Sequence, residues 1–201
     1  MKKLLLLASV ACFAAANASA LTFNPYVAAK AKYAFARHEA KITGSYEGKS
    51  KFHDDIWGGS IALGNTHSLT TGDLRMEVEY TKNADAKKDG MKAETQAVLF
   101  NVYYDLNLDT TLPIKPYAGV GLGWGRTEYK DRSSIKEDGV AMQIGAGVNY
   151  KVCDRTSIDF GYRYITYGDF DKEYRAGLIY EKVDYKPRAH ELLLGLRYEF
   201  K

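Results

Sequence analysis

The most restrictive feature of this sequence is an alternation of apolar and polar residues with a period of two. Between Asp73 and Thr81 every second residue is apolar, and the residues between them are charged or carry a hydroxyl. A strand places alternate side chains on opposite faces, whereas a helix would scatter these charges around its surface. The same alternation recurs in 140–152, 158–164 and 192–200, and more weakly in 27–35, 57–63, 98–104 and 118–125. The sequence therefore predicts eight strands.

The segments between these strands alternate in length. The connections near 39–54, 83–92, 130–138 and 168–188 are long or charged, whereas those near 65–72, 105–115 and 153–156 are shorter in total. An even number of strands with the long loops on one side is typical of an outer-membrane barrel with both termini in the periplasm. We therefore predict an all-β fold, an eight-stranded antiparallel up-and-down transmembrane β-barrel.

Composition excludes several other classes of protein. The longest run without charged or amide residues extends from Leu4 to Ala16. It is shorter than the roughly 20 apolar residues that a transmembrane helix requires. The chain has 28 basic and 25 acidic residues, so it offers no strongly basic surface for a nucleic acid. A mean hydropathy of −0.35 is compatible with a barrel, because lumenal and loop residues are polar.

The first twenty residues have the pattern of a secretory signal peptide. Lys2 and Lys3 precede the apolar run, and Ala18-Ser19-Ala20 supplies the small residues that signal peptidase recognises. We predict cleavage after Ala20, which leaves 21–201 as the barrel domain. The alternative, a lipoprotein anchored through Cys12, fits less well because Ser9 stands where such signals carry leucine. Cleavage leaves Cys153 as the only cysteine, so no intramolecular disulfide is expected.

The polar faces of the predicted strands carry a balanced set of charges. Five basic and five acidic residues make up this set: Lys30, Lys32, Arg75, Arg163 and Arg197 with Glu77, Glu79, Asp159, Glu191 and Glu199. In a narrow membrane barrel we expect them to pair as a lumenal charge network, since unpaired buried charges are costly. In a soluble barrel the same residues would be solvated.

Aromatic residues on the apolar faces favour the membrane barrel. They gather near predicted strand ends: Tyr104, Tyr150, Phe160, Tyr198 and Phe200 at one level, and Phe35, Trp57, Tyr80 and Trp124 at the other. Two such girdles match the two interfaces of a bilayer. Glycines at alternate positions from Gly119 to Gly125, joined by Gly145 and Gly147, predict space for the long charged side chains of other strands. They do not form G-x-G-x-x-G before a helix, so a nucleotide-binding loop is not predicted.

Four segments resemble the opacity family of small outer-membrane β-barrels. They are Pro116 to Gly123 (PYAGVGLG), Gly145 to Tyr150 (GAGVNY), Asp159 to Tyr164 (DFGYRY) and His190 to Phe200 (HELLLGLRYEF). The resemblance implies eight strands, variable surface loops and, as in several members, binding to host receptors or serum factors. The last segment also resembles the signal read by the outer-membrane assembly machinery: Gly195, Tyr198 and Phe200 match it, whereas Leu193 and Lys201 depart from it.

The sequence offers no convincing catalytic, cofactor or metal site. His38, His53 and His190 are expected near the extracellular rim, but no two have ligand spacing within one strand, and we interpret them as solvated. His67 and Ser68 are predicted to lie in a periplasmic turn without a carboxylate to orient the histidine. We therefore expect no enzymatic activity and no cofactor.

The predicted extracellular loops are the better candidates for a binding surface. Ten of the twenty residues from Asp169 to Arg188 are charged, and apolar or aromatic residues are interleaved with them. The candidate ligand-binding residues are Lys172, Arg175, Ile179, Tyr180 and Tyr185, joined from the first loop by Tyr46, Lys49 and Phe52. The simpler interpretation is a solvated loop; the functional one is a recognition surface, since tyrosine and isoleucine anchor interfaces better than charge alone.

These observations lead to one main functional hypothesis and two alternatives. The first is an adhesin-like surface protein of a Gram-negative bacterium whose loops bind a host receptor or an extracellular matrix ligand. The alternatives are a narrow porin-like channel for small solutes and a structural barrel for envelope integrity. The expected partners are outer-membrane lipid, lipopolysaccharide and the assembly machinery, with no nucleic acid.

Overall fold

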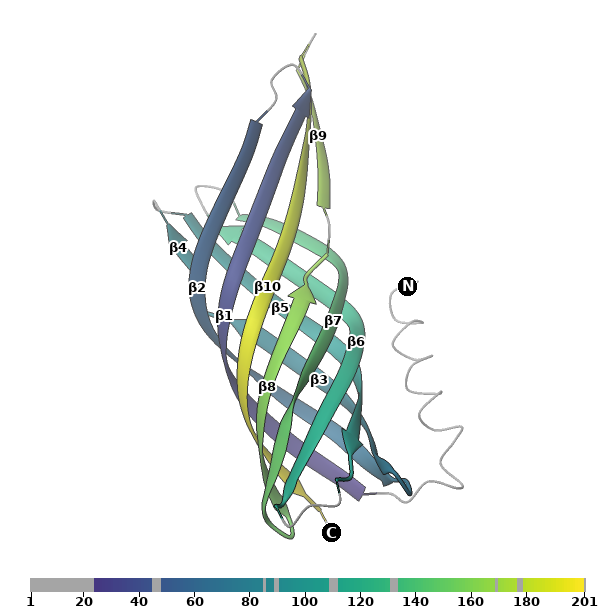
Figure 1. The fold of residues 1–201 in the computed structure, drawn as a ribbon. Coiled ribbons are helices and arrows are strands. Elements are labelled where there is room, and N and C mark those ends of the chain that lie inside the picture. The colour runs from purple at the N-terminus through teal and green to yellow at the C-terminus, as the bar shows by residue number, and fades with distance from the viewer. Residues whose placement is uncertain are drawn as a thin grey trace.

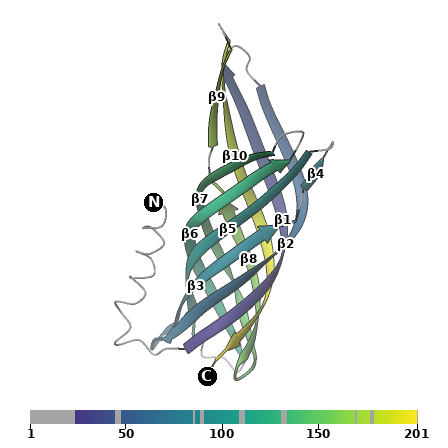
Figure 2. The same cartoon turned by 180° about the vertical axis from the view of Figure 1, so that it is seen from behind.

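The architecture is a closed antiparallel barrel (Figures 1 and 2). The computed structural model describes residues 24–44, 48–84, 86–88, 91–108, 112–130, 134–168, 170–176 and 179–200. Within them the strands are β1 (Asn24–Gly44), β2 (Gly48–Ser68), β3 (Gly72–Asn83), β4 (Ala86–Lys88), β5 (Met91–Leu106), β6 (Ile114–Lys130), β7 (Ser134–Cys153), β8 (Thr156–Thr166), β9 (Phe170–Ala176) and β10 (Ile179–Glu199). No helix in these ranges has the length and apolar character needed to cross a bilayer.

Eight of these strands form the barrel wall. Neighbours pair in the order β1-β2-β3-β5-β6-β7-β8-β10, and β10 closes the ring by pairing with β1 from Tyr26↔Glu199 to Gly44↔Glu181. The short β4 pairs with the first residues of β5, from Ala86↔Ala93 to Lys88↔Met91, and β9 pairs with β10. The prediction of an eight-stranded up-and-down barrel is confirmed, and all eight predicted strands are present.

Strands β8 and β9 continue one another with a kink between them. Gly168 lies in this connection with a φ of 102°, a left-handed conformation that glycine adopts without strain. Below the kink β8 pairs with both β7 and β10, whereas β9 pairs with β10 alone. The kink therefore keeps β9 beside β10 after the chain has left β7.

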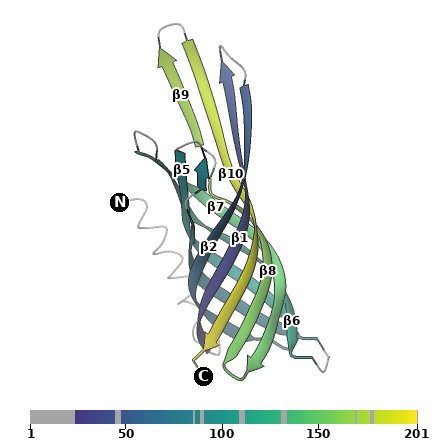
Figure 3. The ribbon, with the colours of Figure 1, turned by 90° about the vertical axis from the view of Figure 1, so that its left-hand side faces the viewer.

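Two of the predicted long loops are largely strands. The ladder between β1 and β2 continues to Ile42↔Gly48, and the ladder between β9 and β10 runs from Tyr185↔Phe170 to Ile179↔Ala176. The expectation of loops over 39–54 and 168–188 is wrong there, because alternation reports which face is buried, while strand pairing needs only backbone groups. Figure 3 shows that these two hairpins extend beyond β5, β6 and β7 at the same end of the barrel.

The two faces of the wall have opposite character. Apolar side chains such as Ile61, Leu63 and Phe160 point outward with 63%, 67% and 64% of their surface exposed. The predicted girdle residues also point outward: Phe35, Trp57, Tyr80, Trp124, Tyr150, Phe160, Tyr198 and Phe200 are exposed and Tyr104 is half-buried. Charged and amide side chains are buried inside. This is the arrangement of a barrel that faces lipid.

The alternate glycines make room mainly for neutral side chains. A Cβ added at Gly147 would lie 2.6 Å from the hydroxyl of Tyr117, and one at Gly119 would collide with the ring of Tyr103. Gly121 faces Asn101 in the same way. The predicted role for long charged side chains is therefore wrong at these positions. The tyrosines of neighbouring strands need this space, and alternation alone does not show which side chain fills it.

Candidate functional site

The ten predicted lumenal charges all lie on the inward face of four strands. They come from β1, β3, β8 and β10, and nine of them are buried: Lys30, Lys32, Arg75, Glu77, Glu79, Asp159, Arg163, Glu191 and Arg197. Glu199, at the periplasmic end of β10, is half-buried. The barrel closure brings β1 and β10 together and so places charges from both ends of the chain in one lumen.

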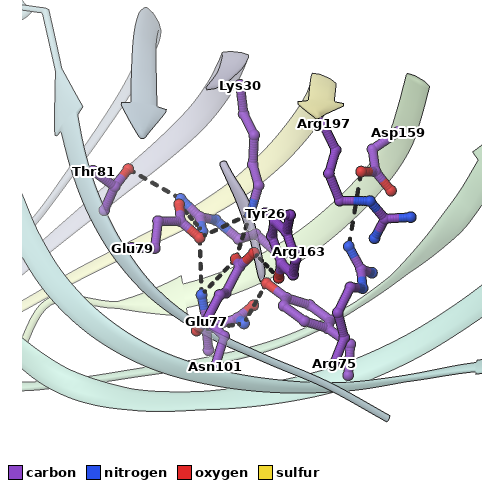
Figure 4. Close-up of polar contacts among 12 residues, drawn as sticks. Tyr26, Lys30, Arg75, Glu77, Glu79, Thr81, Asn101, Asp159, Arg163 and Arg197 are labelled. Carbon is purple, nitrogen blue, oxygen red and sulfur yellow. Dashed lines mark hydrogen bonds and ion pairs between the residues drawn. The ribbon is translucent and has the colours of Figure 1, made fainter. Parts of the chain in front are cut away.

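A dense cluster of ion pairs crosses the middle of the lumen. The guanidinium of Arg163 donates to Glu191 at 2.6 Å and to Glu79 at 2.8 Å, and the ammonium of Lys30 donates to Glu77 at 2.6 Å and Glu79 at 3.1 Å (Figure 4). The two cations and the three carboxylates are almost fully shielded from solvent. Buried charges are tolerated only with such partners, so the cluster ties opposite walls of the barrel together.

Neutral residues complete the hydrogen bonds of this cluster. Asn101 donates to Glu77 at 3.2 Å and Glu79 at 2.9 Å, and Tyr26 donates to Glu77 at 2.8 Å. Tyr167 donates to Glu191 at 2.8 Å. Tyr26, Asn101 and Tyr167 were not predicted from the sequence as members of the network. The inward register of Asn101 was readable from alternation, but its partners on β3 depend on which strands become neighbours.

A second, looser cluster lies toward the periplasmic end. Arg75 donates to Asp105 at 3.0 Å and lies 3.8 Å from Asp159, and its guanidinium stacks over the Tyr103 and Tyr117 rings at 4.7 and 4.8 Å. A buried guanidinium is well accommodated over aromatic faces. Asp105 was missed because its position was interpreted as a connection, whereas it is a residue of β5 near the strand end.

Arg197 is the least satisfied member of this second cluster. It is 5% exposed, and its nearest carboxylates, on Asp105 and Glu199, lie 3.9 Å away. Its Nε and Nη1 atoms have no hydrogen-bond partner. Its guanidinium lies 5.4 Å from the Tyr26 ring. The contrast with Arg163 shows that the lumen is tight in the middle and looser near the periplasmic mouth.

An apolar layer closes the lumen on the extracellular side of the ion pairs. Its members are buried residues of β1, β5, β7, β10 and the end of β8: Ala34, Ala97, Leu99, Ala141, Ile165, Tyr167 and Ala189. On β5, which runs toward the periplasm, Leu99 comes just before Asn101. Water and ions would have to cross this layer as well as the charge cluster.

Cavity sizes agree with a filled lumen. Beside Arg75, Tyr103 and Gln143 the interior cavity measures about 10 Å³, which is at the limit for a single water. A larger hollow of about 300 Å³ opens at the periplasmic mouth. A third hollow, of about 790 Å³, lies mainly on the outer surface, where Ala29, Ala31 and Gly59 are small. In the described residues, none of these hollows is a through channel.

The predicted ligand-binding residues lie on the extracellular hairpins. Lys49 and Phe52 are residues of β2, Lys172 and Arg175 of β9, and Ile179, Tyr180 and Tyr185 of β10; Tyr46 lies outside the described residues. Their side chains also lie outside the described part of the chain. The backbone places their strands in one sheet with the order β2-β1-β10-β9, which we call the extracellular sheet.

The remaining sequence candidates have separate positions. Gly195 faces the lumen, and Tyr198 and Phe200 face outward with ring centroids 5.4 Å apart. His67 and Ser68 are the last residues of β2, not part of a turn, because the ladder with β3 extends to Ser68↔Asp73. Nδ1 of His190 lies 2.6 Å from the hydroxyl of Tyr162 on the outer face. No group of three potential ligands for a metal occurs among the described residues, which leave out the side chains of His38 and His53.

Curated relatives are distant and cover only part of the chain. An uncharacterised protein of Brucella abortus and another of Brucella suis are each 28% identical over 144 residues, which are 57% of this chain. The chain matches about half of their length, 50% in each case.

Solved structures agree with the barrel. Neisserial surface protein A has a TM-score of 0.58 and 25% identity, over 88% of this chain and 97% of its own. OprG, an outer membrane protein of Pseudomonas aeruginosa, has a TM-score of 0.62 and 12% identity, over 90% of this chain and 97% of its own. None of these names denotes an enzyme. The sequence model described as "Outer membrane protein beta-barrel domain" matches residues 4–200, and this chain belongs to that family of outer-membrane barrels.

Proposed function

We propose that this protein is an adhesin-like surface protein whose extracellular sheet and turns bind a host receptor or an extracellular matrix ligand. The observation that carries the proposal is the contrast between a filled lumen and four strands that continue as a paired sheet beyond the rest of the wall. A rigid barrel with a filled lumen is suited to hold a recognition surface outside the membrane.

We also propose how the barrel is exported and assembled, and which lipids surround it. Residues 1–20 direct export and are removed, and Gly195, Tyr198 and Phe200 are read by the outer-membrane assembly machinery. Outer-membrane lipid and lipopolysaccharide then surround the outward apolar face. Two outward-facing aromatic clusters support this, because amphipathic rings are stable at the headgroup level. One of them is the pair Tyr198 and Phe200, and the other is centred on Tyr33. In the second cluster Tyr33 contacts both Phe35 and Trp57, each with ring centroids 5.0 Å apart.

Deletion of 172–183 tests the binding function. The deletion removes the ladder from Lys172↔Val183 to Ile179↔Ala176 and joins Asp171 to Asp184 as a two-residue turn, which the pair Tyr185↔Phe170 closes. We expect whole cells that display the variant to lose adhesion to immobilised fibronectin, laminin or host-cell monolayers. The matched control deletes 129–135 from the β6–β7 hairpin, which leaves Glu128 and Lys136 as a two-residue turn closed by the pair Thr127↔Glu137. Heat-modifiable gel mobility verifies assembly. Adhesion equal to that of the full-length protein on every surface would contradict the proposal.

The porin-like alternative has its own measurement. Planar bilayers containing the refolded protein should show no reproducible conductance steps, because the Arg163 cluster and the Leu99 layer both block the lumen. Regular unitary steps would favour the channel instead.

A further inference from the structure

The upper part of β2 has a partner strand on one side only. β2 pairs with β1 from Thr66 up to Gly48, but its ladder with β3 reaches only from Ser68 to Gly58. The last bond on the β3 side runs from the amide of Ala84 to the carbonyl of Trp57 at 2.7 Å. In the described ranges no strand pairs with 48–56 on that side. We call residues 49–55 the open edge of β2.

The hydrogen bonds identify which backbone groups the open edge presents. In an antiparallel ladder the amide and carbonyl of one residue point to the same side, and successive residues alternate. Since the carbonyl of Trp57 points toward β3, the amides and carbonyls of Lys49, Lys51, His53 and Asp55 point to that side too. The register with β1 runs without a shift from Asn24↔Thr66 to Ile42↔Gly48, so this alternation holds throughout.

The pairing of β1 with β10 independently identifies the same residues of β2 as those whose backbone groups point away from β1. The amide of Phe200 donates to the carbonyl of Pro25 at 2.9 Å, so odd-numbered residues of β1 point toward β10. Even-numbered residues of β1 then point toward β2, where Ala36 faces Asp54 and His38 faces Phe52. These β2 residues use their backbone groups on β1, and the intervening ones remain for the open edge.

An edge of this kind is a template for another strand. Unpaired amides and carbonyls in a row recruit an extended segment, and main-chain hydrogen bonds supply affinity in such complexes. The membrane-spanning part of the wall has no such edge among the described residues, because barrel closure gives each of its strands a partner on both sides. The open edge lies beyond that closed ring, in a continuation of the strand on the side of the predicted extracellular loops.

We propose that the open edge of β2 binds an extended peptide segment of an extracellular protein as an added strand. This inference rests on the proposed function and gives its mode of binding. The edge is basic at its distal end, with Lys49 and Lys51, and acidic near the barrel, with Asp54 and Asp55. Opposite charges stabilise cross-strand pairs, so the segment carries acidic residues opposite the lysines and basic residues opposite the aspartates.

Proline substitution distinguishes backbone pairing from side-chain contact. Lys51→Pro and His53→Pro each remove one amide that points to the open edge, and proline is tolerated at such positions of edge strands. Lys51→Ala and His53→Ala are the matched controls, since they change the same side chains and keep the amide. All four variants retain the backbone bonds to β1, which come from the intervening residues.

The probe is a set of ten-residue peptides selected from a random display library on the wild-type protein. The protein is held one copy per lipid nanodisc, and binders to empty nanodiscs are removed. We expect the selected peptides to bind each proline variant about fivefold or more weakly and each alanine variant within about twofold, in line with the loss of one net hydrogen bond. In the wild-type complex, amide exchange should slow at Lys49, Lys51 and His53 and stay unchanged at Ser50 and Phe52.

Three results would overturn the inference. They are equal binding by the proline variants, an equal loss in the alanine variants, or no selected peptide that slows exchange at the alternate amides. If a proline variant fails to assemble, the exchange pattern of the wild-type complex decides. Loss of adhesion after deletion of 172–183, together with any of these results, would leave the proposed function standing and remove only the edge-pairing mode.

Discussion

The lumen and the extracellular sheet are built from the same strands but satisfy their polar groups in different ways. Inside the membrane, β1 pairs with both β2 and β10, and lumenal side chains such as Arg163 of β8 and Glu191 of β10 form ion pairs as short as 2.6 Å. Beyond it, the sheet ends at β2 on one side and β9 on the other. Closure leaves little for a ligand to contact, whereas an edge leaves backbone groups available. Unpaired backbone groups are therefore available to a ligand where the ladder opens, beyond the closed part of the wall.

The largest expected effect concerns the charge that bridges the lumen. Arg163→Met leaves Glu79 and Glu191 buried without their main partner, and we expect the free energy of unfolding to fall by about 3–5 kcal/mol. Urea titration in lipid vesicles, followed by tryptophan fluorescence, measures this. Adding Glu79→Gln to the variant should recover part of the loss, because Lys30 then keeps Glu77 and Glu191 keeps Lys32 as charged partners. A loss below about 1 kcal/mol for the single variant would show that the cluster contributes little.

A charge on the opposite face of the wall tests which side meets lipid. Leu194 is 49% exposed on the outward face of β10. Leu194→Arg should cost about 2–4 kcal/mol in a bilayer, the penalty for arginine near the midplane. Vesicle unfolding measures the cost, and Leu194→Met is the control of similar size. If Leu194→Arg left stability unchanged, this position would lie at the headgroup level, and the membrane-spanning part of the wall would be shorter than we expect.

A smaller effect is expected where glycine makes room in the lumen. A Cβ at Gly147 would collide with the backbone carbonyl of Phe160 and lie 2.6 Å from Tyr117, so Gly147→Ala should destabilise by about 1–3 kcal/mol. Gly59→Ala is the matched control, because its Cβ would meet only the Lys30 carbonyl at 3.4 Å, and it should stay within about 0.5 kcal/mol. Equal losses in the two unfolding titrations would mean that the tyrosine does not depend on Gly147.

The smallest effect should come from an ion pair of similar length outside the lumen. The Nε atom of Arg126 lies 2.6 Å from Asp138, but the two side chains are 45% and 27% exposed. Arg126→Gln should change stability by less than about 1 kcal/mol, because solvent screens exposed pairs. The same titration in higher salt should reduce the difference further. A loss as large as that of Arg163→Met would break the distinction between the two regions.

Much of the wall was predictable because lumen-facing polar residues and lipid-facing apolar residues alternate along each strand. The alternation placed Lys30, Glu79 and Arg163 on the polar face, and these residues do face the lumen. It did not identify Asp105, whose strand continues past the last clear alternation, or Tyr167, which follows β8. Both contribute buried hydrogen bonds. Their partners lie on strands distant in sequence, so local pattern carries no information about them.

The extracellular side was less predictable for a related reason. The charged segments were recognised, but the continuation of β9 and β10 as paired strands was not. Outside the membrane both faces of a strand meet water, so polar residues occur at every position and the period of two disappears. Backbone pairing persists there without a signal in the side chains.

The sequence by itself determined the class of fold, because eight alternating segments with uneven connections have few solutions other than a closed barrel with one apolar face. The tertiary structure alone decided which charges pair across the lumen, how glycines seat Tyr103 and Tyr117, and where β2 loses its neighbour. These features depend on strand register and on ring closure between β1 and β10. Register and closure join residues far apart in the chain, and periodicity describes only residues close together.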